Sequence, residues 1–146
     1  MVIKNLTIMF FLLSFLFTQA QSRAVESIEI KELDSHDETR RAEYQYEKIA
    51  CEKFKPTKEQ IINYFKISEE ESGSGNWLHE YYSPCISRGK VTFKDGSSGN
   101  WNIQSSGLGF VIFNNGKTAN FFYKNNKWTD PYACSYGLGD DPEPGC

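Results

Sequence analysis

The apolar residues of one stretch recur at helical spacing. In KPTKEQIINYFK the apolar stripe includes Ile61 and Phe65, and residues at this spacing share one face of a helix. Thr57 precedes Gln60 by three positions. In such a capping box the hydroxyl accepts from an early helix N–H while the amide reaches back to the cap residue. The pattern therefore predicts a short helix over about residues 58–66.

Further along, the pattern changes to short runs rich in aromatic and β-branched residues. These runs are KVTFK, NWNIQ, LGFVIF and TANFFYK, separated by DGSSG, SSG and NNGK. Gly-containing turns of this length join neighbouring antiparallel strands, so an antiparallel meander is predicted. The run at 108–113 is apolar at nearly every position. We expect it inside the sheet, with both faces at least partly covered and the helix over one of them.

The N-terminal part divides into a leader and an arm. Residues 1–20 carry one early charge, Lys4, and then an uncharged apolar run that is too short for a comfortable membrane span. Small residues at Thr18 and Ala20 suit a signal peptidase, so we expect a removed export signal and no integral span afterwards. A second cut could follow Ala24. Residues 21–43 should form a charged, flexible arm, although VESIEIKEL alternates like a strand.

Residues 44–146 are expected to form one α+β domain that two disulfides stabilise, with a Gly/Pro/Asp-rich C-terminal tail. An even number of cysteines in an exported chain favours disulfides over free thiols. Three pairings are possible, and we favour Cys51 with Cys85 and Cys134 with Cys146, since the tail between the last two can double back. Zinc is not expected, because the chain has no CxxC and only two histidines. No metal or cofactor is predicted.

The charge balance argues against nucleic acid as a partner. The formal net charge is −3 and becomes more negative once Lys4 leaves with the signal. Nucleic-acid recognition needs clustered Lys and Arg that displace counterions. A mildly acidic chain is compatible with a basic protein partner.

The tetrapeptide SGNW occurs twice, at 74–77 and 98–101. The similarity stops at these four residues, so it does not reach the length of a structural repeat. We interpret each copy as a turn whose tryptophan enters the core. A duplicated binding site would require Trp77 and Trp101 to be exposed and close together.

Candidate catalytic groups are few. The chain has no GxSxG, HExxH or Gly-rich phosphate loop. A nucleophilic pair of Cys85 and His79 is conceivable, but the disulfide interpretation is favoured, and His36 in the charged arm is expected to be solvated. The triplet 69–71, three glutamates beyond the helix, could supply a glycosidase carboxylate but is typical of a solubilising cap. We therefore predict a protein that is not an enzyme.

The order of CEKFKPTKEQIINYF, YYSPC and GKVTFKDGSSGNWNI resembles that of small exported proteins of Gram-negative bacteria, some of which are immunity proteins that neutralise toxins in the periplasm. The resemblance is one of layout, spans residues 51–123 and includes no diagnostic motif. It implies a periplasmic or secreted protein. No binding residue can be carried over from it.

The sequence thus predicts an immunity or inhibitor protein that blocks a toxin or enzyme by steric occlusion. Its candidate contacts are the exposed Gly-rich hairpin tips and Glu69, Glu70, Glu71, Trp77 and Trp101. The alternative is a cell-wall or carbohydrate-binding module that uses exposed aromatic and amide residues. The residues that motivate this alternative are Trp77, Trp101, Trp128, Asn114, Asn115, Asn125 and Asn126.

Overall fold

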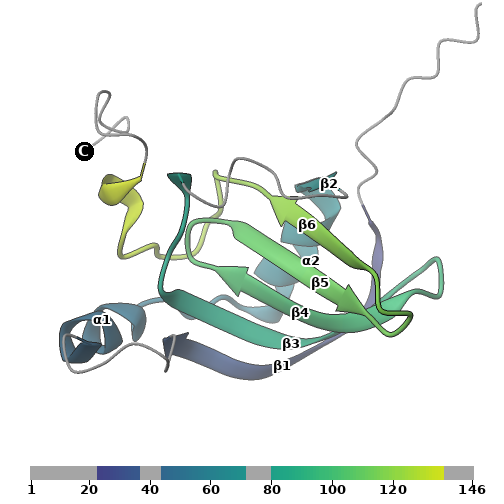
Figure 1. Ribbon diagram of the computed structural model, residues 1–146, viewed down its shortest axis with the longest axis horizontal. Coiled ribbons are helices and arrows are strands. Elements are labelled where there is room, and N and C mark those ends of the chain that lie inside the picture. The colour runs from purple at the N-terminus through teal and green to yellow at the C-terminus, as the bar shows by residue number, and fades with distance from the viewer. Residues whose placement is uncertain (1–22, 37–43, 72–79, 137–146) are drawn as a thin grey trace, which may run out of the picture.

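A six-stranded antiparallel sheet with helices forms an α+β fold (Figure 1). The computed structural model describes residues 23–36, 44–71 and 80–136. The strand order is β1-β3-β4-β5-β6-β2. The elements are β1 (Val25–His36), α1 (Tyr44–Cys51), α2 (Lys58–Ile67), β2 (Glu69–Glu71), β3 (Cys85–Phe93), β4 (Ser98–Gln104), β5 (Leu108–Phe113), β6 (Thr118–Phe122) and the short 3₁₀ helix η1 (Ala133–Ser135).

The predicted helix and meander are confirmed. In α2, the Gln60 N–H donates to Thr57 Oγ1 at 3.2 Å and the Thr57 N–H donates to Gln60 Oε1 at 2.8 Å, so both halves of the capping box are present. Strands β3 to β6 pair in sequence order, and β5 lies between β4 and β6. Its side chains reach both faces: Val111 is fully buried, whereas Ile112 points outward and is 48% exposed.

Two elements near the N-terminus differ from the prediction. The described chain has two α-helices instead of one, because residues 44–51 form α1. The first half of the arm is the edge strand β1, which pairs with β3 from Val25 opposite Phe93 to His36 opposite Cys85. Its alternation therefore does form a strand. The predicted flexible remainder, residues 37–43, lies outside the described residues.

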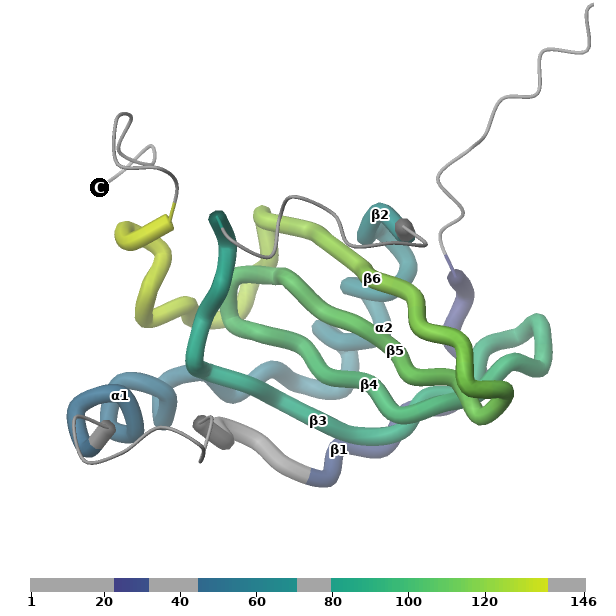
Figure 2. Tube along the Cα trace, in the orientation of Figure 1, coloured from purple at the N-terminus to yellow at the C-terminus, as the bar shows by residue number. Residues whose placement is uncertain are grey.

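The core lies between α2 and one face of the sheet, as Figure 2 shows with α2 behind the strands. The Phe65 ring packs edge-on against Phe93 at 5.4 Å and Phe121 at 5.2 Å between centroids. Tyr64 is fully buried and donates from its hydroxyl to the carbonyls of Gly107 (3.1 Å) and Phe121 (2.9 Å). Fully burying a large apolar side chain such as Phe65 contributes about 1.5–3 kcal/mol, so the packing of α2 on the sheet contributes much of the stability of this core.

The predicted disulfide between Cys51 and Cys85 is present and ties the end of α1 to the start of β3. None of the described cysteines is free. Cys146 lies outside the described residues, so the pairing of Cys134 with Cys146 stays a prediction.

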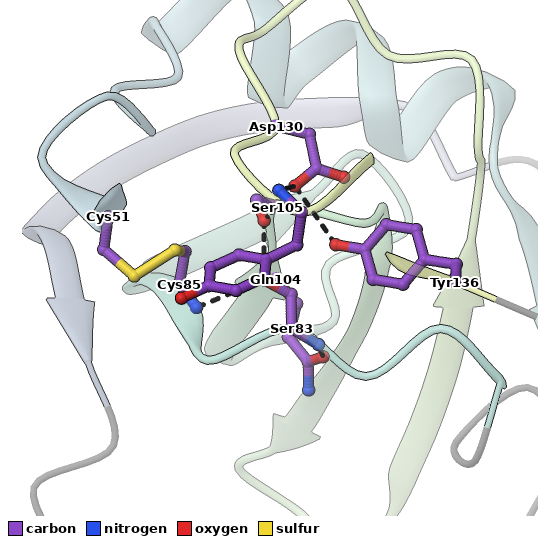
Figure 3. The surroundings of a disulfide bond; sticks show 8 residues. Cys51, Ser83, Cys85, Gln104, Ser105, Asp130 and Tyr136 are labelled. Atoms are coloured by element: carbon purple, nitrogen blue, oxygen red, sulfur yellow. Dashed lines mark hydrogen bonds between the residues drawn. A yellow bond between two sulfur atoms is a disulfide. The ribbon is translucent and has the colours of Figure 1, made fainter. Parts of the chain in front are cut away.

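Beside the disulfide, a buried polar network anchors the C-terminal segment (Figure 3). Ser83 Oγ and Ser105 Oγ lie 2.6 Å apart, and the Ser105 hydroxyl donates to Asp130 Oδ1 at 2.6 Å. The Tyr136 hydroxyl donates to the same oxygen at 3.1 Å. Burial raises the pKa of Tyr136 well above its ordinary value, so this phenol stays a hydrogen-bond donor.

Among the described helices, none has the length and apolar content needed to cross a membrane.

Candidate functional site

Two hairpin turns at one end of the sheet have the same backbone geometry. They are residues 93–97 (FKDGS) between β3 and β4 and residues 113–117 (FNNGK) between β5 and β6. In each, the Phe N–H donates to the carbonyl four residues on at 2.8 Å, and the Gly N–H donates to the Phe carbonyl at 2.9 Å. Gly96 and Gly116 have φ of 82° and 81°, a left-handed conformation that glycine adopts without steric penalty.

A side-chain oxygen closes each turn from within. Asp95 Oδ1 accepts from the Ser97 N–H at 2.8 Å, and Asn115 Oδ1 accepts from the Lys117 N–H at 3.0 Å. Asp and Asn commonly bond their own backbone two positions on in this way. The bonds from Ser97 lower the pKa of Asp95, and the charge of Arg23 lowers it further. Both tips are therefore fixed turns.

The two tips lie side by side and project from the sheet. Because β4 and β5 are neighbours, the Asn114 N–H reaches the Ser98 carbonyl at 2.9 Å, and Asn114 Nδ2 donates to Ser98 Oγ at 2.9 Å. A Cβ added at Gly96 or Gly116 would meet no heavy atom within 4 Å. Figure 1 shows both turns together at the right-hand end. We call Arg23 with residues 94–97 and 114–117 the hairpin edge.

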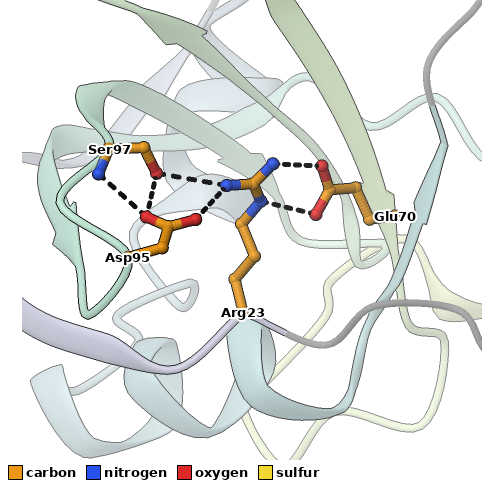
Figure 4. A network of polar contacts seen from close by, with 4 residues as sticks. All are labelled: Arg23, Glu70, Asp95 and Ser97. Carbon is orange, nitrogen blue, oxygen red and sulfur yellow. Dashed lines mark hydrogen bonds and ion pairs between the residues drawn. The ribbon is translucent and has the colours of Figure 1, made fainter.

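Arg23, just before β1, holds the hairpin edge together (Figure 4). Its guanidinium donates to both carboxylate oxygens of Glu70, at 2.6 and 2.9 Å, and to Asp95 Oδ2 at 2.7 Å. It also lies over the rings of Phe93 (5.5 Å) and Phe113 (5.0 Å), the first residues of the two tips. The bond to Glu70 raises the pKa of Arg23, so the charge is permanent.

The Arg23–Glu70 pair also brings the two edges of the sheet together. Arg23 leads into β1 at one edge, and Glu70 belongs to β2 at the other. The sheet must therefore curl around α2 for the pair to form. Side-chain exposures of 23% and 15% place this pair in a partly desolvated position, where a bidentate arginine–carboxylate contact is stronger than on an open surface.

The three glutamates predicted as partner contacts, Glu69, Glu70 and Glu71, lie in a different environment from the one we expected. Glu69–Glu71 are strand β2, paired with β6, and do not form an unstructured cap beyond the helix. Glu69 is exposed, but Glu70 is bound by Arg23 and is not a free acid. The side chain of Glu71 lies outside the described residues. Only one of the three glutamates is thus shown as available to a partner.

Of the two tryptophans predicted as partner contacts, the one that the structure describes is buried. Trp101 is 1% exposed, and its Nε1 donates to the Lys90 carbonyl at 3.1 Å. Its ring covers Gly89, where an added Cβ would lie 2.7 Å from the indole. This confirms that the second SGNW tryptophan fills core, and it removes Trp101 as a partner contact. Trp77 and the first SGNW copy lie outside the described residues.

The remaining candidates do not form a site in the described chain. Cys85 is in the disulfide, so the thiol of the conceivable Cys85–His79 pair is not available as a nucleophile. His79 lies outside the described residues. His36 ends β1, and its side chain also lies outside them.

No protein-family model, curated protein or solved structure matches the chain. The interpretation of the site therefore depends on its own geometry. Two exposed turns, held by a partly buried ion pair, form a narrow projection with little freedom to rearrange. Such a projection can enter a concave surface of another protein, and its prior order reduces the entropy lost on binding.

The sequence predicted the glycine turns but not their shared F-x-(D/N)-G-x unit or the contacts of Arg23 that join them. The recurring unit is F-x-(D/N)-G-x, twenty residues apart, and not SGNW. The aligned DG and NG dipeptides, each following a phenylalanine by two positions, could have indicated it. Nothing local indicated Arg23, since its partners lie 47 and 72 residues away.

Proposed function

We propose that the protein is an inhibitor or immunity protein that inserts its hairpin edge into a cleft of a toxin or enzyme. The observation that carries this proposal is the pair of adjacent, projecting turns that Arg23 ties to β2. Occupation of the cleft excludes substrate sterically, so the inhibitor needs no reactive group. In this proposal the protein acts as an exported, periplasmic or secreted, binding protein and not as an enzyme.

The charges on the tips favour a particular kind of cleft. Lys94 and Lys117 are exposed and form no ion pair with another described residue, whereas the charge of Asp95 is shared with Arg23. A cleft with an acidic rim therefore suits the tips better than the basic partner that the net negative charge of the chain suggested. Complementary rim charges mainly raise the association rate, and β2 would flank the contact.

The second predicted disulfide, Cys134–Cys146, belongs to the same proposal. It would close the C-terminal tail at the end of the sheet opposite the tips, where Cys51–Cys85 and the Asp130 network already lie. That end would then stay rigid while the hairpin edge binds.

The test is affinity capture from native envelope and periplasmic extract with the chain from residue 21 as bait. We expect one stoichiometric protein on the wild-type bait, and loss of that protein from the K94E/K117E double variant. Both lysines are exposed, so neither replacement removes a contact of the fold.

The matched control is K53E, which changes an equally exposed lysine just beyond α1, at the disulfide end of the molecule. It should capture as much partner as the wild type. Recovery of no protein by any bait would contradict the proposal. Equal recovery by K94E/K117E and wild type would show that any partner binds elsewhere.

A further inference from the structure

A second surface, at the other end of the strands from the hairpin edge, has the features of a small-molecule site. A groove of about 310 Å³ runs between α2 and the segment that follows β6. This volume is at the low end of the range of about 300–1,000 Å³ for ligand sites. Its lining combines exposed polar side chains with Tyr123 and Trp128, which pack against the core.

One stripe of α2 forms the first wall. Gln60, Asn63 and Ile67 recur at helical spacing and line the groove, while Ile61, Tyr64 and Phe65 turn to the sheet. The helix therefore has a core side and, next to it, an amide-bearing side. Asn63 is exposed, and its amide makes no hydrogen bond within the described chain.

The loop after β6 supplies the rest of the lining. Tyr123 and Trp128 contribute ring surface, and the adjacent Asn125 and Asn126 contribute amides. The Trp128 ring is held in place because its Nε1 donates to the Ser105 carbonyl at 2.8 Å and the ring contacts Phe54 at 5.7 Å. Asn126 Nδ2 donates to the Tyr123 carbonyl. Asn125, in contrast, is exposed and makes no hydrogen bond within the described residues.

The chemistry of the groove selects the class of ligand. Each free amide offers two donors and an acceptor, and the ring surface between the amides is apolar with a polar edge. Glu59 and Lys127 line the groove with opposite charges, so the groove carries no net charge. A neutral ligand fits this groove when it carries hydroxyls for the amides and apolar ring faces for the aromatic surface.

We propose that this groove binds an oligosaccharide through Asn63 and Asn125, with Tyr123 beneath the sugar ring. The inference is independent of the proposed inhibitor function, because it uses residues at the far end of the strands from the hairpin edge. It also replaces the glycan site that Trp101 would have formed, since that indole is in the core.

The test is ¹⁵N-resolved NMR titration of the folded chain with two probes, N,N′-diacetylchitobiose and cellobiose. We expect saturable shifts at Asn63, Asn125 and Tyr123 with at least one probe. The dissociation constant should be on the order of 1 mM, as the efficiency of small ligands implies. N63A and N125A should each weaken binding about fivefold through loss of one or two hydrogen bonds.

The matched control is N100A, which removes an equally exposed amide from the open face of the sheet. It should bind the probe as the wild type does. Absence of saturable shifts with both probes would overturn the proposal, as would shifts confined to the open face. Equal affinity of N63A, N125A and wild type would overturn it too, whatever the result of the protein capture.

Discussion

Removal of the Arg23 side chain should destabilise the fold and loosen the hairpin edge. A charge-assisted hydrogen bond contributes about 1.5–3 kcal/mol when well protected, but exposed ion pairs contribute only about 0.2–1 kcal/mol. The Arg23–Glu70 pair, at 23% and 15% exposure, lies between these limits. We therefore expect a coupling free energy of about 1–2 kcal/mol between the two side chains.

A double-mutant cycle of R23M and E70Q measures this coupling. Methionine keeps a long apolar side chain at this position, but R23M removes the guanidinium with its hydrogen bonds and its contacts with the rings of Phe93 and Phe113. The cycle with E70Q extracts from that loss the part that depends on Glu70. R23A loses the ion pair and the two ring contacts, worth about 0.5–1 kcal/mol each, and should lower the unfolding free energy by about 3 kcal/mol in total. The corresponding decrease in Tm is about 10 °C.

The assay is urea unfolding followed by tryptophan fluorescence, with K31M as the control. Lys31 is an exposed cation on β1 that forms no ion pair with another described residue, so K31M should be near wild-type stability. A coupling below about 0.3 kcal/mol, within the usual error of additivity, would refute the view that Arg23 and Glu70 join the sheet edges.

Three further outcomes follow from the structure. Burial raises the pKa of Tyr64 well above its ordinary value, so the stability that its neutral phenol contributes should be complete below about pH 10 and decrease as the pH rises beyond it. Y64F should flatten this alkaline decline while costing about 1–3 kcal/mol at neutral pH. Identical alkaline stability curves for Y64F and wild type would contradict the assignment. Replacing Cys51 and Cys85 together by alanine should cost about 4 kcal/mol in urea, since the cross-link closes a loop with a sequence separation of 34; peptide mapping that links Cys51 to any other cysteine would refute the pairing. If the chain is exported as proposed, the intact mass of the mature protein should place its first residue at Gln21, because a cut after Ala24 would remove Arg23 and its contacts with Glu70 and Asp95. A chain that starts at Val25 would show that the ion pair is dispensable.

The elements that the sequence predicted correctly are specified by neighbours in the chain. The capping box of Thr57 and Gln60 fixes the start of α2 through bonds between residues three apart. Each hairpin turn is likewise closed by a side chain and a backbone N–H two residues apart. Local chemistry of this kind can be read without knowledge of the tertiary fold.

The elements that were missed depend on distant contacts. Helix α1 has only eight residues, its apolar residues Tyr46 and Ile49 are 85% and 61% exposed, and its end is tied to the sheet by the disulfide from Cys51 to Cys85, 34 residues along the chain. Three consecutive glutamates have low strand propensity, and pairing with β6 decides their conformation. The hairpin edge was anticipated only as separate exposed tips, because Arg23 meets its partners across much of the chain.

The acidic strand β2 has a consequence for behaviour at high protein concentration. An open sheet edge offers unpaired N–H and C=O groups to any passing chain, and short strands, charged side chains and irregular pairing all discourage such aggregation. At one edge, β2 is only three residues long and entirely glutamate. At the other edge, the pairing of β1 shifts register after Val25, Ile30 and Glu32, and such bulges twist an edge away from regular pairing. Both described edges therefore carry features that discourage the addition of a strand from another chain.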